Sequence, residues 1–239
     1  MSAFVEAGCK ITEFTPVDLR NHLRMNQSLG LPLKNAPKAS LKNRQWVIDM
    51  LGYCVEDNYQ DLRGLPLAIL ANNSLEVFGY SSINPIFIPT SEIQREIFAD
   101  YPEWFLHSDV YQGMYLHRKE GVSYMNSAEV ARNLTNIFSS TQWQPHGENL
   151  PNEEWLILVY RYFTGVNKRD LPVDELKKIL LVPGNDGQLY QGGLVETPLL
   201  LRDNIDEKII AAIKYFGATL VEASVELEEA IFKFVERYP

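Results

Sequence analysis

The sequence of 239 residues has little cysteine and no long hydrophobic run. Its two cysteines, Cys9 and Cys54, are far apart in the chain and form no Cys-x-x-Cys pair. Such sparse cysteine is typical of a reducing compartment, so we expect a cytoplasmic protein. No apolar run approaches the ~18 residues that a membrane-spanning helix requires, and the first residues lack the basic and apolar regions of a secretory signal. We therefore expect no membrane partner.

Positive charge is also scarce, because the formal net charge is −9 at pH 7. Phosphate binding depends on clustered Lys and Arg, so this balance speaks against a nucleic-acid partner. The N-terminal part is an exception, and a regulatory module that binds nucleic acid through this basic segment is an alternative hypothesis. A solvated linker is the simpler interpretation. The basic residues concerned are Arg20, Arg24, Lys34, Lys38, Lys42 and Arg44.

Motifs of the common enzyme classes are missing as well. The sequence contains neither a Gly-x-Ser-x-Gly elbow nor a P-loop. Cys54 falls on the apolar face of a predicted helix, where the thiolate form is not activated. We expect no catalytic residue, no cofactor-binding residue and no metal ligand, and hence a protein that is not an enzyme.

One segment supports a different alternative. His107, Asp109 and His117 are close enough in sequence to suggest a metal site, which would make the protein a metal-dependent hydrolase. Imidazole and carboxylate groups are common zinc ligands, but this spacing matches no usual ligand pattern. Isolated histidines are more often surface residues, so this hypothesis ranks below a non-catalytic function.

The most informative stretch covers residues 61–78. An apolar run from Leu65 to Leu70 is followed by a polar break and a second apolar run from Leu75 to Phe78. This pattern predicts two short strands joined by a tight turn. Asn72 and Asn73 suit the turn, because asparagine tolerates positive φ.

A second hairpin is predicted at residues 179–190, where Asp186-Gly187 supplies the favoured turn pair. Each hairpin follows a strongly apolar helix, at residues 41–57 and 153–165. A lone hairpin is only marginally stable in water, so each one needs a helix to cover its apolar face. We infer an α+β fold of short antiparallel sheets, built from β-hairpins and packed against several helices.

The remaining pattern sets the domain organisation. Residues 27–40 are rich in Gly, Pro and Ser and predict a linker. We expect an N-terminal helix and linker over residues 1–40 and one α+β domain over 41–239, with lobes at 41–140 and 141–239. Further helices are predicted near 15–25, 91–101, 128–138, 172–178, 206–216 and 225–237, with short strands near 86–88, 104–107 and 219–221.

Three segments occur in a characteristic order. They are Tyr53–Asp57 with Leu62–Ala71, then Trp143–Pro145 with Leu150–Leu156, and then Leu180–Leu189. They resemble the repeat region of the sacsin family, in which a helix leads into Leu-x-Gly-Leu-Pro-Leu. A Trp, a Pro and Pro-x-x-x-Trp-Leu follow in that family, and then a Leu-Leu-Pro-x-x-x-Gly-x-Leu hairpin. The resemblance covers roughly residues 41–225, and it departs from the family at the first turn, where Asn72-Asn73 stands in place of Asp-Gly.

The resemblance implies a function. In sacsin-like proteins these repeats are chaperone-associated interaction modules that stand beside an ATPase domain like that of the ninety-kilodalton heat-shock chaperones. The Asp-x-Gly-x-Gly loop of that ATPase is absent from this sequence. The resemblance therefore predicts a non-catalytic protein-interaction scaffold, with heat-shock chaperones or their clients as partners.

Overall fold

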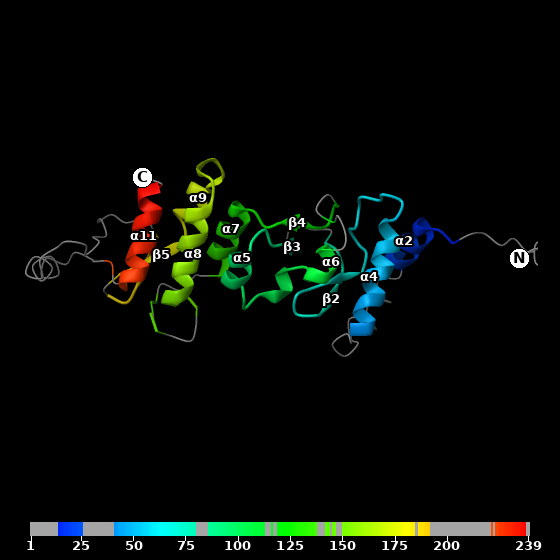
Figure 1. Cartoon of the computed structure of the whole chain (residues 1–239), viewed down its shortest axis with the longest axis horizontal. Helices are drawn as coiled ribbons and strands as arrows, with labels where there is room; N and C mark the ends of the chain where they lie inside the picture. The colour runs from blue at the N-terminus through cyan, green and yellow to red at the C-terminus, as the bar shows by residue number, and fades with distance from the viewer. Residues whose placement is uncertain are drawn as a thin grey trace, which may run out of the picture. The chain divides into compact units, whose positions relative to one another are not determined.

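The computed structural model describes residues 14–25, 41–79, 86–112, 116, 119–137, 142–143, 145–146, 150–184, 186–191, 221 and 223–237. Over these residues, helices alternate with short two-stranded sheets, which confirms the predicted α+β fold (Figure 1). The chain divides into two compact units. Unit 1 comprises Met1–Pro89 and Ala99–Tyr124, and unit 2 comprises Thr90–Phe98 and Met125–Pro239.

This division differs from the lobes expected at residues 41–140 and 141–239. The main boundary falls after Tyr124, and residues 90–98 join unit 2 because their helix packs on a later helix of that unit. The N-terminal helix expected within residues 1–40 belongs to unit 1 and packs on its second helix.

Unit 1 contains two long helices, α2 (Pro16–Met25) and α4 (Leu41–Val55), and the shorter α6 (Ser108–Gln112). In Figure 1, α2 lies beside α4. The start of α2 is a reciprocal cap, as Thr15-Pro16-Val17-Asp18 suggests. The Asp18 amide donates to Thr15 Oγ1 at 3.3 Å, and the Thr15 amide donates to Asp18 Oδ2 at 2.9 Å.

The first predicted hairpin is confirmed. Strand β1 (Ala68–Ile69) pairs antiparallel with β2 (Leu75–Glu76), and Asn73 adopts a φ of 64° in the turn. The Asn72 side chain accepts a hydrogen bond from the Ser74 amide at 2.9 Å, which closes the turn from within.

A second sheet of unit 1 is parallel and was not predicted. It pairs β3 (Phe87–Ile88) with β4 (Ser123–Tyr124). The strand predicted at residues 104–107 is present only as isolated bridges from Phe105 to Phe87 and from Leu106 to Leu70, directly after a 3₁₀ turn (Pro102–Trp104).

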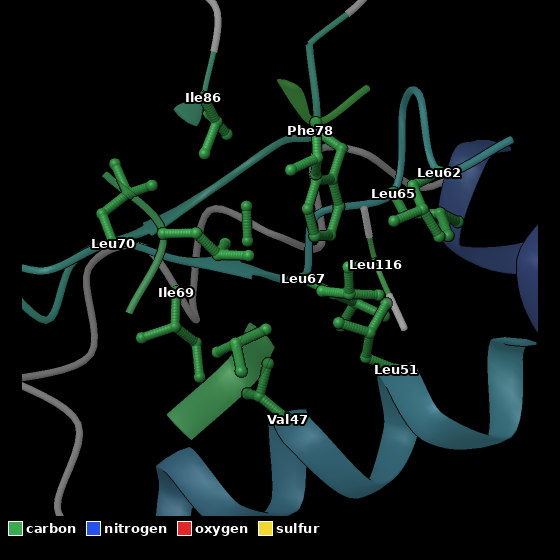
Figure 2. Close-up of a cluster of buried hydrophobic side chains, with 14 of the residues drawn as sticks. Val47, Leu51, Leu62, Leu65, Leu67, Ile69, Leu70, Phe78, Ile86 and Leu116 are labelled. Atoms are coloured by element: carbon green, nitrogen blue, oxygen red, sulfur yellow. The ribbon is translucent and has the colours of Figure 1, made fainter. Parts of the chain in front are cut away.

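The core of unit 1 forms between α4 and the hairpin. Val47, Leu51 and Cys54 lie three to four residues apart on one face of α4 and are buried. Figure 2 shows Val47 and Leu51 on the side of α4 that faces the hairpin residues Leu67 and Ile69. This packing gives the hairpin the apolar cover that two short strands lack on their own.

Unit 2 contains the second predicted hairpin, which is also confirmed. Strand β5 (Leu180–Pro183) pairs antiparallel with β6 (Leu189–Gln191), and Gly187 takes a φ of 76° in the turn. Over the described residues, the helices of this unit are α5 (Glu92–Ile97), α7 (Ser127–Ile137), α8 (Glu153–Gly165), α9 (Val173–Leu176) and α11 (Val225–Arg237), with a 3₁₀ turn at Lys168–Asp170.

Helix α8 is the centre of unit 2, and α11 lies beside it (Figure 1). The Asn152 side chain caps its start by accepting from the Trp155 amide at 3.0 Å. Trp155 Nε1 donates to the Ile97 carbonyl at 2.8 Å, and the Tyr160 hydroxyl donates to the Leu181 carbonyl at 3.0 Å. These bonds fix α8 to α5 and to β5.

Two further expectations concern the C-terminal part. The helix predicted at 206–216 lies outside the described residues, as does the strand predicted at 219–221 apart from Val221, which forms a bridge to Gly184. Among the helices that the structure describes, none combines the length and the apolar character needed to cross a bilayer.

Candidate functional site at the contact between α2 and the end of α4

The most elaborate polar contact of unit 1 joins α2 to the chain that follows α4. Arg20 and Arg24 are four residues apart, so they share one face of α2. Leu19 and Leu23 precede them and pack, partly buried, against the hydrophobic core of unit 1. The Leu-Arg-x-x-Leu-Arg spacing therefore combines an apolar contact with a pair of guanidinium groups.

Arg20 is a buried side chain that makes three hydrogen bonds and one ring contact. Its Nη1 and Nη2 atoms donate to the two carboxylate oxygens of Asp57 at 2.8 and 2.7 Å, and Nη1 also donates to the Cys54 carbonyl at 2.6 Å. The guanidinium carbon lies 3.8 Å from the centre of the Tyr59 ring. A bidentate ion pair and a cation–π contact thus act on one group.

Arg24 uses the fork of its guanidinium in a different way. Its Nε donates to the Arg63 carbonyl at 3.0 Å, and Nη2 donates to the Asp61 carbonyl at 2.7 Å. Its Nη1 donates to the Tyr59 hydroxyl at 3.0 Å. Three acceptors in a fixed arrangement suit the planar guanidinium and not the single ammonium group of lysine.

These partners all lie in one segment, residues 54–63, which we call the acceptor segment. Asn58, with a φ of 60°, turns the chain after α4. Asp61 Oδ1 accepts from the Arg63 amide at 3.0 Å. Backbone bonds from Leu62 to the Glu120 carbonyl (2.9 Å) and from Glu120 to the Gln60 carbonyl (2.7 Å) tie the segment to the rest of unit 1.

The acceptor segment carries two carboxylates that are paired with arginines, Asp57 with Arg20 and Asp61 with Arg63. The hydrogen bond from Arg20 lowers the pKa of Asp57, and that from Arg63 lowers the pKa of Asp61, so both carboxylates are ionised at neutral pH. Lys119 donates to the Tyr59 carbonyl, and its desolvation there lowers its pKa. Burial raises the pKa of the Cys54 thiol to about 11, which makes this cysteine unreactive.

The residues of the metal hypothesis are only partly brought together. His107 Nδ1 lies 3.7 Å from Asp109 Oδ2, while His117 lies outside the described residues. Arg44 Nη1 lies 2.6 Å from His107 Nε2 and 3.3 Å from Asp109 Oδ2. Arginine can only donate, so it engages the ring nitrogen and the carboxylate that a metal would require. Over the described residues, no group of three or more His, Cys, Asp or Glu is placed to hold a metal ion.

Three of the six basic residues of the nucleic-acid hypothesis, all of them arginines, make contacts within unit 1. Arg20, Arg24 and Arg44 are bonded within the unit, as described above. Lys34, Lys38 and the side chain of Lys42 lie outside the part of the chain that the structure describes. The sequence signalled these arginines as a basic run, but it gave no partner for them.

Unit 2 has a buried polar group that sequence reasoning also missed. Gln94 accepts from the Thr90 amide at 2.7 Å and donates to the Met125 carbonyl at 2.7 Å and to the Tyr162 hydroxyl at 2.9 Å. These three bonds satisfy a fully buried amide and join α5 to α8. This role is structural, and the α2 contact is the stronger candidate for function.

Comparisons of the chain with models of known protein families, with curated proteins and with solved structures give no match.

Proposed function

We propose that the chain is a non-catalytic protein-interaction scaffold of the sacsin type, which acts in the cytoplasm on heat-shock chaperones or their clients. The observation that carries the proposal is the position of the sacsin-like segments. Leu62–Ala71 enters hairpin β1–β2 directly after α4, and Leu180–Leu189 forms hairpin β5–β6 after α8. Rigid hairpins backed by helices suit a surface for contact with other proteins.

Several polar side chains of the described residues are engaged in structural contacts, and this supports the same proposal. Arg20 and Gln94 are buried and hydrogen-bonded, and Arg44 is bonded to His107. The Cys54 thiol, with its pKa raised by burial, is kept in its unreactive form. A buried free thiol is also in keeping with a reducing cytoplasm.

The experiment combines binding and turnover on the purified full chain. We expect saturable binding to a purified ninety-kilodalton heat-shock chaperone, or to a thermally unfolding reporter enzyme, measured by sedimentation velocity. We expect ATP turnover no higher than that of a heat-denatured sample. Turnover that increases with the concentration of folded chain would overturn the proposal, as would failure to bind both the chaperone and the unfolding enzyme.

A further inference from the structure

We propose that the acceptor segment is a docking site for a partner helix carrying Leu-Arg-x-x-Leu-Arg, and that α2 is a tethered occupant which masks this site until the partner displaces it. The inference rests on the proposed scaffold function and names the partner class that the scaffold would bind.

The attachment of α2 is narrow and mostly polar. Arg20 is the only residue of α2 that is fully buried, while Met25 and Val17 expose 84% and 48% of their surface. The contact consists mainly of two partly buried leucines and two arginines. A helix held in this way resembles a bound peptide more than a core element, because most of its surface is not part of the hydrophobic core.

The receiving surface is complementary in charge to the two arginines. It offers the carboxylates of Asp57 and Asp61, the face and hydroxyl of Tyr59, and three backbone carbonyls. Its shape is fixed by bonds that do not involve α2, such as Asp61 with Arg63 and Leu62 with Glu120. A preformed site of this kind can accept the same groups from another helix, since little ordering is needed on binding.

Because α2 is joined covalently to the rest of unit 1, it can cover the acceptor segment and still be displaced by a partner helix. The chain between α2 and α4 is residues 26–40, and the sequence predicts a linker over residues 27–40. A ligand joined to its site by a linker of this length, long enough to span the two, is held at an effective concentration of roughly 1 mM. If a free peptide bound the open site with a Kd of about 10 µM, the tethered helix would weaken its apparent binding about 100-fold.

The test uses the full chain and a fluorescein-labelled peptide of residues 13–26, with binding followed by fluorescence anisotropy. In the chain carrying Arg20→Ala and Arg24→Ala, the tethered helix has lost its two anchors, so the peptide should bind about 100-fold more tightly than to the wild-type chain. If that variant fails to fold, a chain that keeps Arg20 and Arg24 can be cut once at a protease site introduced within residues 27–39. The labelled peptide should then replace the cleaved α2 on the acceptor segment.

Peptide variants define the partner chemistry. Each Arg→Ala change in the peptide should weaken binding about 10- to 100-fold, because it removes charge-assisted hydrogen bonds. Replacing Arg20 and Arg24 with lysine should also weaken binding, while Asn21→Ala, at an exposed position, should leave it unchanged. A designed helix that keeps only Leu19, Arg20, Leu23 and Arg24 on an alanine-rich background should bind as the native peptide does.

The outcomes separate this inference from the proposed function. If the peptide binds neither the chain carrying Arg20→Ala and Arg24→Ala nor the cut chain, the docking site is overturned. This holds whether or not the chain binds chaperones. Binding that survives the loss of both peptide arginines would also overturn it, and so would failure of the designed helix. ATP turnover by the folded chain would instead overturn the scaffold function and leave the measured docking unaffected.

Discussion

The burial of Leu51 on α4 gives a quantitative test of how the first hairpin is held. Leu51 has no exposed surface and lies between α4 and the hairpin, whereas Trp46, five residues earlier on the same helix, exposes 53% of its surface. Leu51→Ala removes buried apolar atoms and leaves a cavity whose walls, a long helix and a paired hairpin, cannot close readily. We expect a loss of about 3–4 kcal/mol in the free energy of unfolding.

Trp46→Ala is the matched control, because it removes a larger side chain from the exposed face of the same helix. We expect a loss of no more than about 1 kcal/mol. Urea unfolding followed by far-UV circular dichroism measures both, since this signal does not depend on tryptophan. With a slope of about 2 kcal/mol per molar urea, Leu51→Ala should lower the midpoint by about 1.5–2 M. A larger loss for Trp46→Ala than for Leu51→Ala would refute this account of the core.

Three further predictions test other parts of the structure. Gly121→Ala should destabilise the protein by about 1–3 kcal/mol in thermal unfolding, because Gly121 has a φ of 98° and an added Cβ would lie 3.2 Å from a backbone nitrogen. Gly52 of α4 has open space around an added Cβ, so Gly52→Ala should instead stabilise the protein by up to about 1 kcal/mol. Asp57 and Asp61 have lowered pKa values in the folded protein, so their stabilising contribution is present above about pH 4 and is lost as the pH falls below it. The melting temperature of the wild-type protein should therefore drop below about pH 4, and it should drop less steeply in the Asp57→Asn variant. An equal drop in the wild type and in the variant would contradict this prediction. Trp155→Phe should cost about 1–2 kcal/mol in urea unfolding by leaving the Ile97 carbonyl without its donor, and an unchanged midpoint would show that this bond contributes nothing.

The elements that the sequence predicted well are those whose signals are local. Both hairpins follow from apolar runs interrupted by turn residues, and the turn at Asn73 and the turn at Gly187 lie where those residues predicted them. The starts of α2 and α8 also have local signals, since Thr15 and Asn152 cap these two helices with their own side chains.

The remaining features depend on pairing between distant residues, which a single sequence does not reveal. The parallel pairing of Phe87 with Ser123 was missed for this reason. Trp46 lies within an apolar helix, but that helix turns its side chain outward and buries Val47 instead, which depends on how the helix packs. The basic run was visible, whereas the ion pair between Arg20 and Asp57 required the fold to bring them together.

The central claim is that unit 1 carries a contact site which its own helix occupies, and one comparison tests it directly. Arg20→Ala with Arg24→Ala, and Asp57→Asn, both break the same ion pair, but only the first change leaves the site intact. The affinity of the full chain for the peptide of residues 13–26 should rise about 100-fold in the first variant and stay as weak as in the wild type in the second. Equal affinities in the two variants, with both folded by circular dichroism, would contradict the claim.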